Sequence, residues 1–267
     1  MICEREMQAD IFSKRQQNSL LFFALLAVLT VGSIMITGYD VAKGFTSIFK
    51  ALVWGLTNFY PDSGSFLKLP DISVKLVETV LMSIASTTIA ALFAFPLALA
   101  GARGTRVNRL SGVVSRGIAS VFRNIPLVAW AMVLMLAFSQ HLLTGYLALF
   151  LGSLGFLTRA FIETIDEVSN NSVEAVQATG ANYFHIVFQA VLPSSMPQMI
   201  SWLLFMIETN IRNATLVGIL TGTGIGFSFD LYYKRLDYHS ASLVVILIVI
   251  TVIAIEFMSN KIRRVIL

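Results

Sequence analysis

The sequence predicts an all-α membrane protein with about six transmembrane helices. Of its 267 residues, 56% are hydrophobic and only 13% are charged, whereas a soluble domain carries about 25% charged residues. The hydrophobic residues gather in long runs, and a run of about 20 residues crosses a hydrocarbon core about 30 Å thick. A water-soluble fold is therefore a poor fit, and the whole length is interpreted as one membrane helix bundle.

The first predicted span covers residues 19–38. This run is longer than the hydrophobic core of a signal peptide, and no small-residue cleavage site follows it, so a retained helix is expected. The tail before it contains the single cysteine, Cys3, which excludes an internal disulfide and a cysteine-rich metal site. With the long extracytoplasmic loop that follows, this helix forms an expected N-terminal region of residues 1–74.

Five further hydrophobic runs predict the remaining spans, at residues 77–101, 124–140, 143–165, 196–218 and 239–258. One of these, 143–165, contains Arg159 and Glu163. The two lie one helical turn apart, so each can neutralise the other. The later spans form an expected core of residues 75–267, and six spans in total place both termini on one side.

Lysine and arginine in the connections indicate the orientation. Both tails and the connection after the second predicted span carry more of these residues than the loops on the opposite side. Cytoplasmic loops are enriched in them, so both termini are expected in the cytoplasm. The net charge of +4 is interpreted as this topology signal and not as nucleic-acid binding, because the basic residues lie beside hydrophobic runs.

A short helix is predicted in the connection 166–195, which has no Lys or Arg and is placed in the cytoplasm by its neighbours. Glu174 stands in the first turn of this helix, where an acidic group complements the helix dipole. Gly180 follows Thr179 and can adopt the left-handed conformation that ends a helix.

A second short helix is predicted after Gly180, and Pro193 is expected to stop it before the next span. Four residues form an apolar stripe on it: Tyr183, Phe184, Val187 and Phe188. The hairpin is expected to have no partner inside the chain, and an exposed apolar surface of this kind marks a protein contact. A helix on lipid headgroups would normally be basic, so the absence of Lys and Arg favours protein docking.

These residues carry a family resemblance. The stretch Glu174-Ala175-Val176-Gln177-Ala178-Thr179-Gly180, with Leu192-Pro193 after it, resembles the EAA signature of ABC importer permeases, although Val176 and Ala190 depart from the pattern. The resemblance implies a type I ABC importer permease with a coupling helix that docks on the ATPase subunit. The implied coupling residues are Glu174, Ala175, Gly180, Tyr183, Phe184, Leu192 and Pro193.

The fifth predicted span contains a second set of candidate residues. An arginine within a membrane costs about 2.5–3.5 kcal/mol on insertion scales, so Arg212 is expected to face the bundle interior or a wet cavity. Glu208 lies one turn earlier and can pair with it, and Asn210 and Asn213 flank it. These four residues are candidates for the translocation pathway, and a purely structural ion pair is an equal alternative.

The same region resembles the phosphonate branch of these permeases. The stretch Asn210-Ile211-Arg212, with Ala214-Thr215 and the glycines of residues 222–226, is its more specific sign. The stretch Arg123-Asn124-Ile125-Pro126 is shared with methionine-type importers. The resemblance covers about residues 75–267, and the glycine cluster is expected to be a flexible extracytoplasmic turn.

The resemblance implies a permease subunit in the bacterial inner membrane that carries phosphonate or a related phosphorus oxyanion. The implied partners are a second copy of the chain, ABC ATPase subunits that bind ATP and Mg, an extracytoplasmic binding protein and membrane lipid. The chain has no Gly-x-x-x-x-Gly-Lys-Ser/Thr sequence and so is not itself the ATPase. No catalytic residue, metal site or cofactor is expected in it.

Three alternatives stay open. The first is an importer for another solute, such as phosphite, a phosphate ester or methionine. A secondary transporter would need paired intramembrane carboxylates and inverted repeats. A membrane-embedded enzyme would need converging acids, histidines or a metal cluster. The sequence contains neither of the last two patterns.

Overall fold

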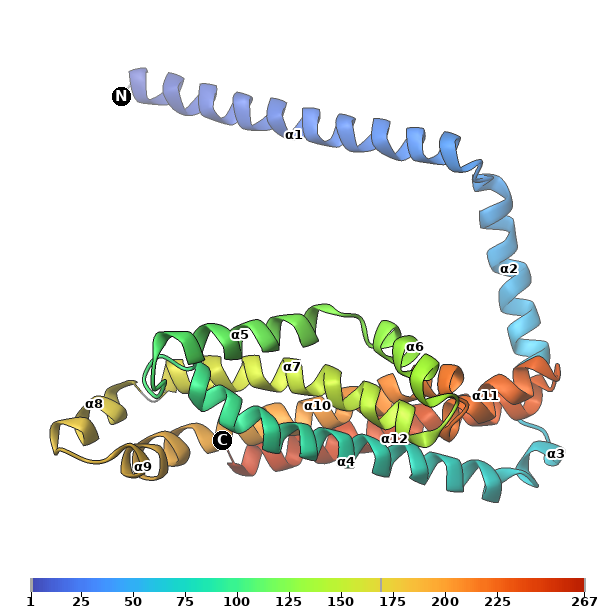
Figure 1. Ribbon diagram of the computed structural model, residues 1–267. Coiled ribbons are helices and arrows are strands. Elements are labelled where there is room, and N and C mark those ends of the chain that lie inside the picture. The colour runs from blue at the N-terminus through green and yellow to red at the C-terminus, as the bar shows by residue number, and fades with distance from the viewer. Residues whose placement is uncertain (1, 169, 267) are drawn as a thin grey trace. The chain divides into compact units, whose positions relative to one another are not determined.

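The computed structural model describes residues 2–168 and 170–266, and within them the regular elements are helices. The chain divides into two compact units, Met1–Thr57 and Asn58–Leu267, which we describe separately (Figure 1).

The first unit consists of two helices. Helix α1, Ile2–Thr37, contains the candidate span Lys14–Thr37 with a mean hydropathy of 2.5, which confirms the first predicted span. Gly38 then takes a left-handed conformation with φ of +63°, and helix α2, Val41–Asn58, begins three residues later. Helix α2 lies where the sequence predicted only a loop.

Four long helices form the core of the second unit. Their positions confirm the second, fourth, fifth and sixth predicted spans, with each observed helix extending beyond the prediction. They are α4, Leu69–Gly101; α7, Leu142–Val168; α10, Leu192–Thr221; and α12, Tyr238–Ile266. Helices α4, α7 and α10 pack against one another, and α12 packs against α10 (Figure 1). A short helix α3, Ser63–Phe66, precedes them.

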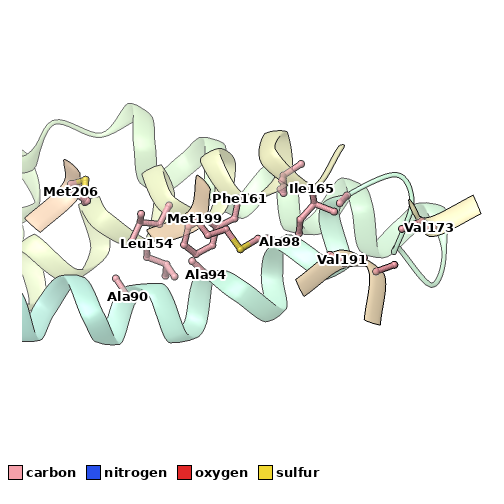
Figure 2. Packing of buried hydrophobic residues seen from close by; sticks show 14 of the residues in the cluster. Ala90, Ala94, Ala98, Leu154, Phe161, Ile165, Val173, Val191, Met199 and Met206 are labelled. Carbon is pink, nitrogen blue, oxygen red and sulfur yellow. The ribbon is translucent and has the colours of Figure 1, made fainter. Parts of the chain in front are cut away.

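Small residues allow α4 to approach α7 closely. Ala90, Ala94 and Ala98 recur every fourth residue on one face of α4 and are fully buried against residues of α7 that include Leu154 and Phe161 (Figure 2). Small side chains at this spacing let helix backbones pack closely in a membrane bundle. On another face of α7, Arg159 Nε donates to Glu163 Oε1 at 2.5 Å, which confirms that predicted pair.

The third predicted span, 124–140, contains α6, Leu127–Phe138, but is wrong in shape, because the helical segment there is short and continues from a second helix across a sharp bend. The structure has two helices here, α5, Arg109–Asn124, and α6, bent by 90° at their junction. Pro126 causes the break, because proline disfavours helical geometry in the residue before it, and Ile125 is extended with ψ of 121°. Helix α6 has 12 residues, about 18 Å, which is too short to cross a membrane alone. The described residues therefore contain five candidate spans, or six if the bent pair is one.

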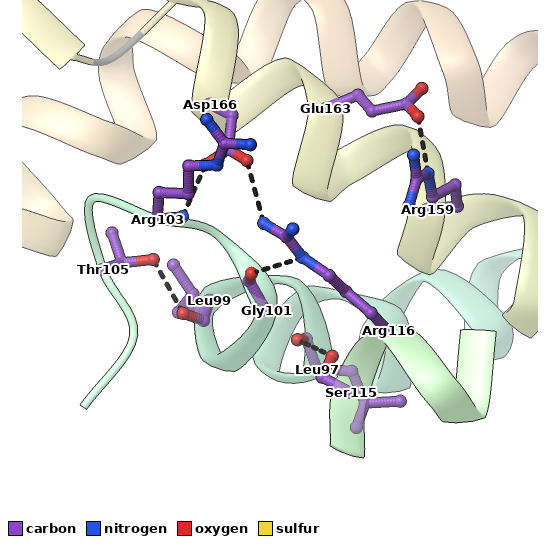
Figure 3. A network of polar contacts seen from close by, with 10 residues as sticks. All are labelled: Leu97, Leu99, Gly101, Arg103, Thr105, Ser115, Arg116, Arg159, Glu163 and Asp166. Atoms are coloured by element: carbon purple, nitrogen blue, oxygen red, sulfur yellow. Dashed lines mark hydrogen bonds and ion pairs between the residues drawn. The ribbon is translucent and has the colours of Figure 1, made fainter. Parts of the chain in front are cut away.

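A polar network ties the ends of α4, α5 and α7 together (Figure 3). Asp166 of α7 accepts hydrogen bonds from the Arg103 backbone N–H at 2.5 Å and from Arg116 Nη2 at 3.2 Å. Arg116 also donates from Nε to the Gly101 carbonyl at 3.1 Å, and Ser115 donates to the Leu97 carbonyl. This network fixes the end of α7 just before the chain enters the hairpin region.

At the other end of the bundle, Lys68 Nζ donates to Asp237 Oδ2 at 2.5 Å and to Ser240 Oγ at 2.9 Å. Burial raises the pKa of Asp237, but its hydrogen bonds from Lys68 and Ser240 outweigh that effect and hold the pKa below its ordinary value. This contact ties the start of α4 to the start of α12.

The glycine cluster is a tightly packed helix junction, so the expected flexible turn is wrong. Gly222 ends α10 in the left-handed conformation, with φ of +69°, and helix α11, Gly224–Lys234, begins two residues later. Helix α11 packs against α10 at Gly226, where an added Cβ would collide with the Thr215 carbonyl oxygen. The buried Ile225 N–H also donates to Thr79 Oγ1 at 2.8 Å. Glycine is required here for close approach of backbones.

Candidate functional site

The predicted hairpin is present between α7 and α10. Helix α8, Asn170–Ala178, leads to Gly180, whose φ is +76°, and helix α9, Tyr183–Ile186, follows. A Cβ added at Gly180 would meet nothing within 4 Å. Glycine is therefore favoured at this turn by its backbone conformation and not by crowding.

The hairpin has an inner face that packs on its own bundle, so the expectation of no partner inside the chain is wrong. Val173 and Ile186 are buried in the same hydrophobic cluster as Ile165 of α7, and Figure 2 labels Val173 and Ile165 among its members. Val187 is also buried. Sequence periodicity alone does not separate this face from the outer one, because both are apolar.

The outer face of the hairpin remains exposed. Phe184 and Phe188 have 71% and 62% of their surface accessible. Among the predicted coupling residues, Leu192 is half-buried and the others are exposed: Glu174, Ala175, Gly180, Tyr183, Phe184 and Pro193. Five of the predicted residues thus lie on the protruding hairpin, and Leu192 and Pro193 lie at the start of α10.

Pro193 does not stop the second hairpin helix, contrary to the prediction. The chain passes from α9 through a π-helical turn, Val187–Val191, directly into α10. The Leu192 N–H donates to the Val187 carbonyl, five residues earlier. This wider turn lets the helix continue through Pro193, which has no N–H to donate. Tyr183–Thr221 is therefore one helical run of 39 residues.

The predicted ion pair in α10 is present. Arg212 Nη2 lies 3.0 Å from Glu208 Oε1. The Glu208 side chain is only 9% exposed, whereas that of Arg212 is 47% exposed. The carboxylate is therefore inside the bundle, and the guanidinium extends from it toward an open face.

A second arginine reaches the same carboxylate from α12, and sequence analysis missed it. Arg263 Nη2 lies 3.7 Å from Glu208 Oε2. Nε and Nη2 of Arg263 are buried and have no hydrogen-bond partner among the described residues. We refer to Glu208, Arg212 and Arg263 as the arginine cluster. The sequence offered no signal for Arg263 beyond its charge, which was interpreted as a topology signal.

Of the two asparagines that flank Arg212 in sequence, Asn210 points away from it, into the core of the bundle. Asn210 is 1% exposed, and its Nδ2 donates to Thr87 Oγ1 at 2.8 Å and to Ser153 Oγ at 2.6 Å. These partners belong to α4 and α7, so Asn210 joins three helices of the core. Positions 210 and 212 are about 200° apart around a helix, and Asn213 is half-buried next to Arg212.

Long apolar helices, a charged cluster among them and a protruding helical hairpin define a multi-pass membrane protein of the transport class. Residues 94–266 match the family described as binding-protein-dependent transport system inner membrane component, and the chain belongs to this family.

Similar proteins include named permeases. The phosphate-import permease protein PhnE of Mycolicibacterium smegmatis is 32% identical over 196 residues, which is 73% of this chain and 37% of that protein. The phosphite transport system permease protein PtxC of Stutzerimonas stutzeri is 31% identical over 71% of this chain and 69% of its own length. The chain thus spans little more than a third of the first of these relatives and about two thirds of the second.

A solved structure has the same fold. A chain of the MetNI methionine ABC transporter in an inward-facing conformation superposes with a TM-score of 0.61 at 22% identity, covering 74% of this chain and 98% of that one.

Proposed function

We propose that this chain is the membrane-spanning permease subunit of an ABC importer for phosphonates or related phosphorus oxyanions. The observation that carries the proposal is the arginine cluster, in which two guanidinium groups from different helices face one buried carboxylate. The cluster keeps a net positive charge among apolar helices, which favours an anionic cargo. The similarity of this chain to a phosphate-import permease and a phosphite transport permease supports the same class of cargo.

The cluster would bind the anion only weakly, because the carboxylate of Glu208 already partly neutralises both arginines. A guanidinium fork matches the oxygens of a phosphonate group, and Glu208 competes with the anion for both arginines. An anion would displace the carboxylate from one arginine while the other still neutralises Glu208. Partial compensation of this kind allows release, which a pair of free arginines would oppose.

Energy for transport comes from a separate ATPase subunit that binds ATP and Mg. The hairpin docks on it through the exposed residues around Phe184 and Phe188. The predicted coupling residues lie on the hairpin and at the start of α10. Both termini and the hairpin lie in the cytoplasm. A second permease chain completes the pathway, and an extracytoplasmic binding protein delivers the cargo. In this proposal residues 75–267 are the permease core, and residues 1–74 precede it.

Reconstitution tests the cargo. Proteoliposomes that contain the permease with the ATPase and binding protein that co-purify with it should take up a labelled alkylphosphonate when ATP is supplied. Excess phosphite or phosphate should compete, and excess methionine should not. Uptake of methionine that no phosphorus oxyanion inhibits would contradict the proposed cargo, and co-purification without any ATPase would contradict the proposed class.

A further inference from the structure

Helix α2 has one strongly apolar face. Six side chains lie within about 100° of its circumference: Val41, Phe45, Ile48, Phe49, Leu52 and Leu56. Lys43, Thr46, Lys50 and Thr57 lie on the opposite side together with one aromatic residue, Trp54, and the helix contains no acidic residue. This division is sharper than in the membrane-spanning helices, which are apolar over most of their surface.

Among the residues of the first unit that the structure describes, none covers this apolar face. No residue of α2 is buried, and Phe45, Phe49 and Leu56 are 70%, 77% and 79% exposed. A contiguous exposed apolar face of six side chains marks a contact with a membrane or with another protein.

The connection to α1 places α2 at a bilayer surface. The candidate span Lys14–Thr37 is 24 residues long, about 36 Å, so it uses the full hydrocarbon thickness. Gly38 turns the chain immediately after the span, and Asp40 Oδ1 accepts the Lys43 N–H at 3.0 Å at the start of α2. Helix α2 therefore begins where the span leaves the hydrocarbon, at the level of the lipid headgroups.

We propose that α2 lies in the membrane interface, with its apolar face among the acyl chains and its two lysines against headgroup phosphates. A helix with one apolar face and a basic polar face is the type that binds in this plane. The charge distinguishes α2 from the hairpin of α8 and α9, which has exposed aromatic residues but no lysine or arginine. The two amphipathic elements thus suit different partners: α2 a lipid surface and the hairpin a protein.

Two neighbouring positions, about 100° apart on the helix, one on each face, test this proposal. In the full-length chain with Cys3→Ser, Phe49→Cys and Lys50→Cys place a nitroxide label on the apolar and the polar face respectively. The protein is reconstituted in nanodiscs of phosphatidylethanolamine and phosphatidylglycerol. Collisions with oxygen, which is concentrated in hydrocarbon, are compared with collisions with a water-soluble nickel chelate.

We expect the label at position 49 to favour oxygen at least several-fold more than the label at position 50. Equal access of the nickel chelate to both labels would place α2 in water and overturn the proposal. A label at position 49 that neither reagent reaches would show that protein covers the apolar face, either the core of this chain or another subunit, and would also overturn it. Leu52→Cys and Thr46→Cys form a second pair with one position on each face, so the result does not depend on one substitution.

Discussion

At the scale of single residues, Glu208 is the carboxylate at which two helices meet. Its oxygens face Arg212 of its own helix and Arg263 of α12, so each arginine is only partly neutralised. The adjacent Arg264 carries the same charge but is exposed. Comparing variants of Arg263 and Arg264 therefore distinguishes a role of the arginine cluster from a general effect of positive charge at the C-terminal end of α12.

Substitution at Arg212 is expected to reduce uptake in a graded way. Arg212→Lys keeps the charge and loses the planar fork, and Arg212→Gln loses both. A hydrogen bond to a charged group contributes about 1.5–3 kcal/mol, so Arg212→Gln should lower uptake by about tenfold or more, and Arg212→Lys by less. Arg263→Gln should resemble Arg212→Gln. Uptake by proteoliposomes at matched permease content measures each effect.

Arg264→Gln is the matched control and should leave uptake unchanged. The combination of Glu208→Gln and Arg212→Gln tests the structural alternative. If this double variant assembles and transports like the parent, the ion pair only holds the helices together.

Gly226 is expected to be essential for the junction of α10 and α11. Gly226→Ala places a methyl group against the Thr215 carbonyl, and overpacking of this kind costs about 1–3 kcal/mol. Gly117 in α5 has nothing within 4 Å of an added Cβ, so Gly117→Ala should be neutral or slightly stabilising. The Tm of each purified variant in detergent gives the comparison. An unchanged Tm for Gly226→Ala would mean that the junction relaxes at little cost.

At the scale of elements, the turn at Gly180 holds the hairpin in shape. Gly180→Val puts a β-branched residue at a φ of +76°, which such residues rarely adopt. We expect normal membrane insertion and a loss of most substrate-stimulated ATPase activity in the reconstituted complex. Gly180→Asn should retain more activity, because asparagine tolerates the left-handed conformation.

Two outcomes for the Gly180 variants would count against a coupling role of the hairpin. Full stimulation of the ATPase in Gly180→Val would show that the hairpin does not transmit the signal. Poor insertion of both variants alike would instead point to a role in folding.

Sequence patterns predicted the elements that hydropathy governs and missed those that depend on contacts. Long apolar runs located α1, α4, α7, α10 and α12, because lipid exposure selects such runs. The run 124–140 was predicted as one straight span because hydropathy carries no information about the extended backbone before Pro126. Helix α2 was missed because the polar residues of its second face, among them Lys43 and Lys50, interrupt the apolar run.

The candidate sites were partly predictable for the same reason. The pairing of Glu208 with Arg212 follows from a local spacing of one turn. The approach of Arg263 depends on how α12 packs against α10, which no local pattern encodes. The burial of Asn210 likewise depends on Thr87 and Ser153, which lie on two other helices.

At the scale of the whole molecule, the orientation in the membrane remains a prediction. A cysteine that replaces Asn182 in the chain with Cys3→Ser should react with an impermeant maleimide only after the cytoplasmic face is exposed, because the flanking connections are richer in lysine and arginine. Labelling in intact cells, before lysis, would contradict the assignment of the hairpin to the cytoplasm.

The π-turn before Pro193 makes the second half of the hairpin and helix α10 one mechanical part. Phe184 and Glu208 lie on the same uninterrupted run of 39 residues, about 36 Å apart along its axis. A helix is stiff to twisting, so torque applied to the aromatic end would rotate the carboxylate relative to Arg263, which belongs to another helix. The π-turn Val187–Val191 joins the two parts of this run. One residue inserted in this turn would rotate Phe184 relative to Glu208 by about 100° around the helix axis. The exposed aromatic face and the carboxylate would then no longer keep their present relative orientation.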